Sequence, residues 1–310
     1  MKIRTKGYIM GAVASAAYGT NPLFALPLFG EGMDSDSILF FRYLLAIPMM
    51  AALMLIRKES FAIKPSELPL LAAMGLLVAT SSLTLFESLR FMDAGIASTM
   101  LFVYPVMVAL IMTAFFGERL TMRTLGCLAL TVAGVVLLYR QSDGATISAK
   151  GSMLVMVSAL AYALYIVGVN RSRLKEMNSL KITFYALLAG MSAFAVRTGF
   201  GEHLFIPCNW QMWIDVGGLA LFSTALSFAF ITMAIHYIGS TPTAILGALE
   251  PVTAIIIGVM VFGEHLTPRI VCGVVLIIAA VTMVVAGGTV SQRIKAAAHH
   301  LPRLHRHSRG

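Results

Sequence analysis

An acidic residue lies inside a long apolar stretch of this sequence, directly before a proline. Glu250 precedes Pro251 within the apolar run 242–262. A charged carboxylate at the centre of a membrane span costs about 2.5–3.5 kcal/mol, so such a group faces a cavity, pairs or takes up a proton. Glu250 is therefore a candidate for proton coupling or for binding a substrate amine. The alternative is structural, with the carboxyl group bonding to the backbone that Pro251 leaves open.

A related pair of residues occurs in the first half of the chain. Tyr104 precedes Pro105 within the run 95–116, and the two prolines stand 146 positions apart (105 to 251). Proline removes a backbone donor, so in a membrane the carbonyl four residues earlier needs another partner. Pro105 and Pro251 are thus predicted hinges of cavity-lining helices. A kink that only serves packing is the alternative for both.

The first apolar run carries the same signal at Asn21-Pro22, which would free the carbonyl of Tyr18. Tyr18 aligns with Tyr162 in the second half of the chain. Paired tyrosines could stack on a solute or hydrogen-bond it, although packing in a helix core is the alternative. The predicted substrate-binding residues are Tyr18, Asn21, Tyr104, Tyr162 and Glu250.

Few other charges lie within the apolar runs. Arg42 lies near the predicted outer end of the second run, where snorkelling to lipid headgroups is the default interpretation and contact with an anionic substrate the alternative. Glu87 and Arg90 stand three residues apart, which predicts a local ion pair. The sequence contains no metal-ligand cluster, nucleophile–base arrangement or phosphate loop. We therefore expect no enzymatic activity, no metal and no cofactor.

Composition places the chain in a membrane. Of its 310 residues 58% are hydrophobic and only 12% charged, and the mean hydropathy is +0.86. A membrane span needs about 20 predominantly apolar residues, and ten runs qualify as helical spans. They are 7–29, 37–56, 68–89, 95–116, 123–140, 151–170, 180–198, 212–236, 242–262 and 269–287.

The chain also contains an internal repeat. The sequence FGERLT that begins at Phe116 returns as FGEHLT from Phe262, and each copy closes a run interrupted by one of the two prolines. Each half holds five predicted spans, and an odd number turns the second half upside down, so we predict an all-α fold of two inverted five-helix repeats. The predicted units are 1–140, 151–287 and a basic tail, 288–310.

The repeated FGE turn is predicted to be a connector. Gly117 and Gly263 would end a helix, and each glutamate would stand before the N-terminus of the next helix, where the dipole favours an anion. Thr267 followed by Pro268 reads as a cap and first helical residue.

The distribution of basic residues predicts the orientation. The net charge is +9, but lysine and arginine gather in alternate loops and in both terminal segments. Because basic loops stay in the cytoplasm, both ends should be cytoplasmic in a multi-pass protein of the cell inner membrane. The tail 288–310 can lie against anionic membrane lipids. We expect no nucleic-acid partner, and the sequence leaves the oligomeric state open.

The paired units around Pro105 and Glu250-Pro251, each followed by its FGE turn, and the two-by-five layout resemble the drug/metabolite transporter superfamily, in its EamA-like ten-span branch. The turn Leu89-Arg90-Phe91-Met92-Asp93-Ala94-Gly95 before the fourth run adds to the likeness. The resemblance covers about 7–287. It implies movement of small organic solutes by alternating access, often outward, with a central cavity built from spans 1, 3, 4, 6, 8 and 9.

These observations predict a secondary active transporter of small organic metabolites, an exporter of an amino-acid-like solute in which protons are a candidate coupling ion. Two alternatives remain open at this point. One is a flippase for a lipid-linked solute, which would need basic residues beside a lateral opening. The other is a non-transporting membrane scaffold, which would not need the prolines or the midplane carboxylate.

Overall fold

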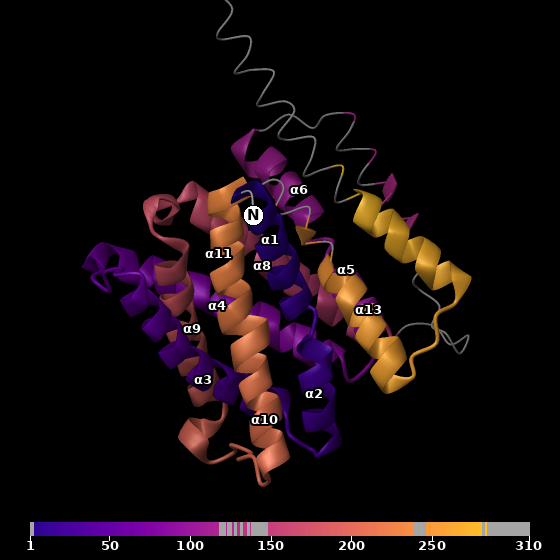
Figure 1. The fold of residues 1–310 in the computed structure, drawn as a ribbon, viewed down its shortest axis with the longest axis horizontal. Helices are drawn as coiled ribbons and strands as arrows, with labels where there is room; N and C mark the ends of the chain where they lie inside the picture. Colours follow the sequence, from indigo (N-terminus) through magenta and orange to yellow (C-terminus); the bar gives the residue numbers. More distant parts are fainter. Residues whose placement is uncertain are drawn as a thin grey trace, which may run out of the picture.

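A computed structural model describes residues 3–117, 148–238 and 249–280, with isolated positions at 122–137, 243–247 and 283. All regular elements in this part of the chain are helices (Figure 1). The main ones are α1 (Ile3–Tyr18), α2 (Asn21–Gly30), α3 (Ser35–Ile56), α4 (Leu68–Ser88), α5 (Ala94–Leu101), α6 (Tyr104–Phe116), α8 (Ala149–Arg171), α9 (Ser179–Arg197), α10 (Trp210–Gly218), the π-helix η4 (Leu219–Leu226), α11 (Ser227–Ile238) and α13 (Leu249–Phe262).

Six helical segments of the described chain are long and apolar enough to cross a membrane. They correspond to predicted spans 2, 3, 4, 6, 7 and 8, and shorter apolar helices cover Leu249–Phe262 and Pro268–Ala280. The multi-pass helical class is therefore confirmed. The predicted span 123–140 and the tail 288–310 lie outside the continuously described residues, so the total of ten spans stays a prediction.

Two predicted spans consist of two helices each. The first span divides into α1 and α2, and Pro22 lies in the first turn of α2, where its missing donor is not needed. The fourth divides into α5 and α6 at residues 102–103, and Pro105 occupies the first turn of α6. Both helix breaks lie within predicted spans, and the hinge role of Pro105 and Pro251 stays a prediction.

Helices from the two halves of the sequence pack against one another. α4 of the first half contacts α8 and α9 of the second, and α1 packs along α11 (Figure 1). The approach of α4 to α9 depends on Gly75, because a Cβ atom there would lie 2.7 Å from the carbonyl oxygen of Ala186. The core beside this contact includes Tyr43 and Phe194, whose rings meet edge to face at 5.4 Å.

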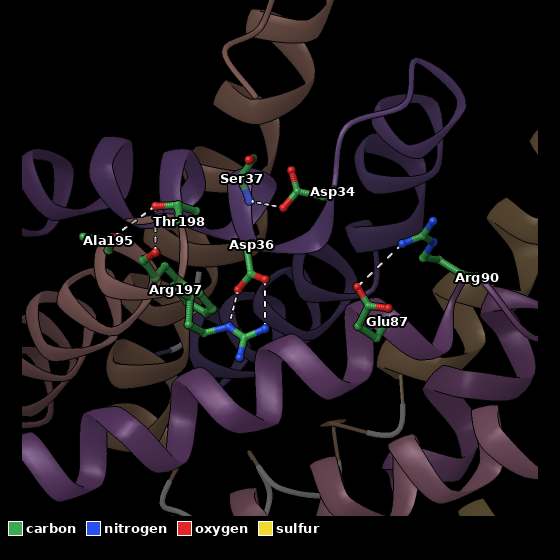
Figure 2. Close-up of polar contacts among 9 residues, drawn as sticks. Asp34, Asp36, Ser37, Glu87, Arg90, Ala195, Arg197 and Thr198 are labelled. Carbon is green, nitrogen blue, oxygen red and sulfur yellow. Dashed lines mark hydrogen bonds and ion pairs between the residues drawn. The ribbon is translucent and has the colours of Figure 1, made fainter. Parts of the chain in front are cut away.

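α3 and α9 are joined at both ends. At one end Arg197 donates to both carboxylate oxygens of Asp36, with Nε–Oδ1 at 2.6 Å and Nη2–Oδ2 at 2.9 Å (Figure 2). At the other, the Asn178 amide donates to Glu59 at 2.6 Å. Because the start of α3 meets the end of α9, and the reverse, the two helices run antiparallel.

The predicted ion pair between Glu87 and Arg90 is confirmed. Arg90 Nη1 lies 3.9 Å from Glu87 Oε1, at the end of α4 and close to the Asp36–Arg197 pair (Figure 2). Both side chains are partly exposed, so this pair contributes little to stability.

Candidate functional site

A central cavity lies between helices of the two halves. Side chains from α1, α3 and α4 line it together with side chains from α8, α9, η4 and α11. Its volume is only about 40 Å³, in narrow gaps between side chains. Tyr18 and Tyr162, both predicted site residues, form part of its wall. A solute larger than a few water molecules would need the helices around this cavity to part.

Tyrosine rings form a cluster at one side of the central cavity. Tyr104 and Tyr162 meet edge to face with ring centroids 4.8 Å apart, although they come from different halves of the sequence. Tyr165, which also lines the cavity, stacks on Tyr162 at 5.9 Å. Tyr104 is therefore next to the cavity wall. Such rings can stack on an organic solute and offer hydroxyl groups to it.

Glu250 lies in the first turn of α13, where its backbone N–H donates to the carbonyl of Gly247 at 3.0 Å. This bond gives the Gly247 carbonyl a replacement for the donor that Pro251 lacks. The side chain of Glu250 is half-buried and lies within electrostatic range of Tyr18, Tyr104 and Tyr162. The structure thus brings four of the five predicted site residues together.

Close contact between α1 and α13 holds this arrangement. A Cβ atom at Gly19 would lie 2.5 Å from the carbonyl oxygen of Glu250, so only glycine lets the end of α1 approach the start of α13. The break between α1 and α2 and the start of α13 are therefore neighbours. Asn21 follows this break and is buried, and its side-chain oxygen has no hydrogen-bond partner in the described structure. Asn21 does not line the central cavity among the described residues, and its role stays a prediction.

Hydroxyl groups that the sequence analysis did not single out lie at the wall of the central cavity or directly behind it. Ser81 and Ser158 are hydrogen-bonded through their hydroxyl groups at 3.0 Å, across the two halves. Tyr43 and Ser82 form a similar bond at 2.9 Å. The consecutive serines at 81 and 82 in an apolar run were a usable signal. Their partners are 77 and 39 positions away, which no local pattern could indicate.

Arg42 also belongs to this site, and the snorkelling interpretation is wrong. Only 4% of the residue is exposed, its Nε donates to Thr224 Oγ1 at 2.9 Å, and the side chain lies within electrostatic range of Tyr18. The guanidinium carbon lies 5.6 Å from the centre of the Phe86 ring. All of these contacts direct the side chain into the central cavity rather than toward the membrane surface.

The π-helix η4 positions the Thr224 hydroxyl. Thr224 Oγ1 donates to the carbonyl of Leu219, five residues earlier, at 3.2 Å, and it accepts from Arg42. π-Helical turns are rare in proteins, and those that occur are often found at functional sites. The sequence around residue 224 carries no distinctive mark of this geometry, so the contact with Arg42 could not have been predicted.

The FGE turn of the second half differs from its prediction in one respect. Thr267 accepts from Ile270 N–H at 3.3 Å, so the predicted cap of the following helix is confirmed. Glu264, however, does not serve that helix. It folds back over Gly258 and accepts the N–H of Ala94 at 2.8 Å, at the start of α5. Burial raises the pKa of Glu264, while the hydrogen bond from Ala94 opposes the shift. Its counterpart Glu118 lies outside the described residues.

A family model for the EamA-like transporter family matches residues 5–140 and 149–286, one copy on each half. The chain belongs to the EamA-like transporter family. The two matched copies are the two EamA repeats, and this membership agrees with the drug/metabolite transporter superfamily proposed from the sequence.

Similar proteins carry transporter names. An uncharacterised transporter of Archaeoglobus fulgidus is 28% identical over 189 residues, which cover 61% of this chain and 66% of that protein. The uncharacterised transporter YvbV of Bacillus subtilis is 26% identical over 231 residues, 72% of this chain and 74% of its own. A solved crystal structure, 17% identical, shares the fold over 94% of this chain with a TM-score of 0.66. Together with the apolar helices, these findings support a membrane transporter.

Proposed function

We propose that this protein is a secondary active transporter that moves a small organic metabolite across the cell inner membrane by alternating access. The observation that supports this most strongly is the central cavity itself. It lies between helices of the two repeats and contains a buried arginine and clustered tyrosines, with a glutamate beside it. A non-transporting scaffold has no need for polar groups of this kind in a membrane, where each of them is costly.

The proline-containing starts of two helices supply the proposed moving parts. Pro105 and Pro251 lie in the first turns of α6 and α13, beside the tyrosine cluster and Glu250. Backbone that is not hydrogen-bonded within a continuous helix can change its dihedral angles at lower cost. Rocking of the two halves about these hinges would open the central cavity to one side of the membrane and then to the other.

Glu250 is the proposed coupling residue. Its carboxyl group is half-buried, forms no salt bridge among the described residues, and lies within electrostatic range of Tyr18 and Tyr104. Such a carboxyl group can bind a proton in one state and a substrate amine in another. We therefore propose an amino-acid-like solute, outward transport and exchange for protons. Tyr18 lies within electrostatic range of both Glu250 and Arg42.

Uptake into proteoliposomes tests the function. Purified protein would be reconstituted, and a labelled panel of amino acids, amines, sugars and nucleosides presented with an acidic interior and with no pH gradient. We expect saturable uptake of a subset, faster with the acidic interior because outward proton movement drives solute entry. Equal uptake into protein-free vesicles for every solute would contradict the proposal and favour a scaffold or a flippase of lipid-linked solutes. Uptake at the same rate with and without the pH gradient would contradict proton coupling and leave the transport function standing.

A further inference from the structure

We propose that Arg42 binds the carboxylate group of the transported solute, an inference that rests on the proposed transport function. Arg42 stands out in the sequence because it is a charged residue within an apolar run, and contact with an anionic substrate was one of its two interpretations. The proposal is based on the contacts that surround Arg42 in the central cavity.

The first step concerns the hydrogen bonds of the guanidinium group. A guanidinium has five N–H donors in a planar fork. Thr224 accepts one of them at 2.9 Å, and Tyr18 lies within electrostatic range. The bond to Thr224 fixes the orientation of the side chain while leaving further donors for a ligand. The Phe86 ring, whose centre lies 5.6 Å from the guanidinium carbon, restricts the group further.

The second step concerns charge. Arg42 is almost fully buried, and no carboxylate of the described chain forms a salt bridge with it. Buried charges in proteins are ordinarily paired. In the described structure the groups around this cation are neutral: the Thr224 hydroxyl that accepts from it, the nearby Tyr18 and the Phe86 ring. An anionic group on the solute would supply the missing negative charge at the moment of binding.

The third step concerns which anion fits. Arg42 is the only charged residue that lines the described central cavity, and the other polar groups there are hydroxyls of serine, threonine and tyrosine. One guanidinium matches the two oxygens of one carboxylate with two parallel hydrogen bonds. A phosphate carries more charge than this single cation balances. A monocarboxylate is therefore the expected class, and with Glu250 nearby the solute would be a zwitterion.

The test compares each amino acid with its own amide. The amide keeps the size, side chain and amine but lacks the negative charge. Proteoliposomes with the wild-type protein would receive labelled L-amino acids, with unlabelled acids or amides as competitors. We expect acids to compete about 10- to 100-fold better than amides, which is the range for one charge-assisted hydrogen-bonded contact.

Variants locate this preference. Arg42→Gln should lose the preference of acid over amide, and Arg42→Lys, which keeps the charge without the fork, should retain part of it. Arg90→Gln makes the same chemical change at an exposed pair outside the cavity and should leave the preference intact. Folding would be checked by size-exclusion profile and unfolding temperature.

The outcomes separate the two proposals. Transport of the panel with equal competition by acids and amides would overturn the role of Arg42 and leave the transport function standing. An unchanged preference in Arg42→Gln would do the same. Absence of any transport by the wild-type protein would overturn both. If Arg42→Gln does not fold, the proposal is still tested by the preference of the wild-type protein for acids over amides and by the weaker preference expected of Arg42→Lys.

Discussion

At the scale of single residues, the two repeats differ in the residue that precedes the proline next to the central cavity. Tyr104 begins α6 directly before Pro105, and Glu250 lies in the first turn of α13 directly before Pro251. Both side chains are near the central cavity, but only one of them can change its charge in the ordinary pH range. Under the proposed function, Glu250 in the second half would carry the coupling chemistry, and Tyr104 in the first half would provide an aromatic surface.

The first prediction concerns Glu250→Gln. The amide has the same shape and cannot exchange a proton, so we expect net transport driven by a pH gradient to fall at least about tenfold. Exchange of labelled for unlabelled solute should survive better, because it requires no proton movement. The measurement compares both modes in proteoliposomes. Unchanged transport with an unchanged pH profile would remove the coupling role of Glu250.

A second prediction concerns Glu264 and its contact with the start of α5. Burial raises the pKa of this carboxyl group above its ordinary value of 4.5, so the unfolded chain releases the proton first as pH rises. The stability from this group is therefore fully present below pH 4.5 and is lost as pH rises through the folded pKa. Glu264→Gln cannot titrate and should gain stability relative to wild type as pH rises above 4.5.

Thermal unfolding of the purified variants measures this difference. Glu264→Ala is the matched control because it removes the acceptor for the Ala94 N–H, and it should lower the unfolding free energy by about 1 kcal/mol, as loss of a helix cap does. The prediction would be contradicted if the wild-type protein became more stable than Glu264→Gln as pH rises. That result would show that the ionised Glu264 carboxylate is the better acceptor for the Ala94 N–H.

Residue-level reasoning from the sequence succeeded where a side chain was chemically out of place. Glu250 was detected because a carboxylate in an apolar run is costly, and Glu87 and Arg90 because their spacing fixes their contact. Arg42 was misread because its distance from the predicted membrane surface matched snorkelling. Its real partner, Thr224, is 182 positions away in a π-helix, and neither fact has a local signature.

At the scale of helices, the prolines divide spans rather than bending them. α5 ends at Leu101 and α6 begins at Tyr104, so a short non-helical segment separates them. The sequence predicted disruption at these points because proline lacks a donor. It could not predict which groups fill the break, because that depends on α8 and α13 packing nearby.

A third prediction follows for the hinges. Pro105→Ala and Pro251→Ala restore a backbone donor and favour a continuous helix, so we expect slower transport, by about tenfold, with an equal or higher unfolding temperature. Transport rates and unfolding curves measured on the same preparations provide the check. Pro48→Ala is the control, since Pro48 lies inside α3 on an exposed side. If the hinge variants transport at the wild-type rate, Pro105 and Pro251 serve helix packing and not movement.

At the scale of the whole molecule, the halves are interleaved. α3 of the first half is joined at both ends to α9 of the second, through Asp36–Arg197 and Glu59–Asn178. Because α3 and α9 are bonded at both ends, we expect the proposed parting of the halves to occur elsewhere, at the proline-containing starts of α6 and α13. The sequence predicted two units but could not show that the central cavity forms across them.

A fourth prediction concerns orientation. The distribution of basic residues predicts that Cys208, between α9 and α10, faces outward and that Ser60, after α3, faces the cytoplasm. With the other cysteines replaced, Cys208 should react in intact cells with a maleimide that cannot cross the membrane. A cysteine at position 60, in a variant without Cys208, should react only after the membrane is opened. Both positions belong to exposed residues, and the reverse pattern would invert the predicted topology.

The central claim is that solute passes through the central cavity between the repeats. Ser82→Cys in a cysteine-free variant tests it most directly, because Ser82 lines the cavity, and Ser192→Cys on the exposed side of α9 is the control. The two would be treated with a small impermeant thiol reagent from each side of the membrane. We predict that Ser82→Cys reacts from both sides, is protected by transported solute and loses transport when modified. Access from neither side, or modification that leaves transport intact, would contradict the account.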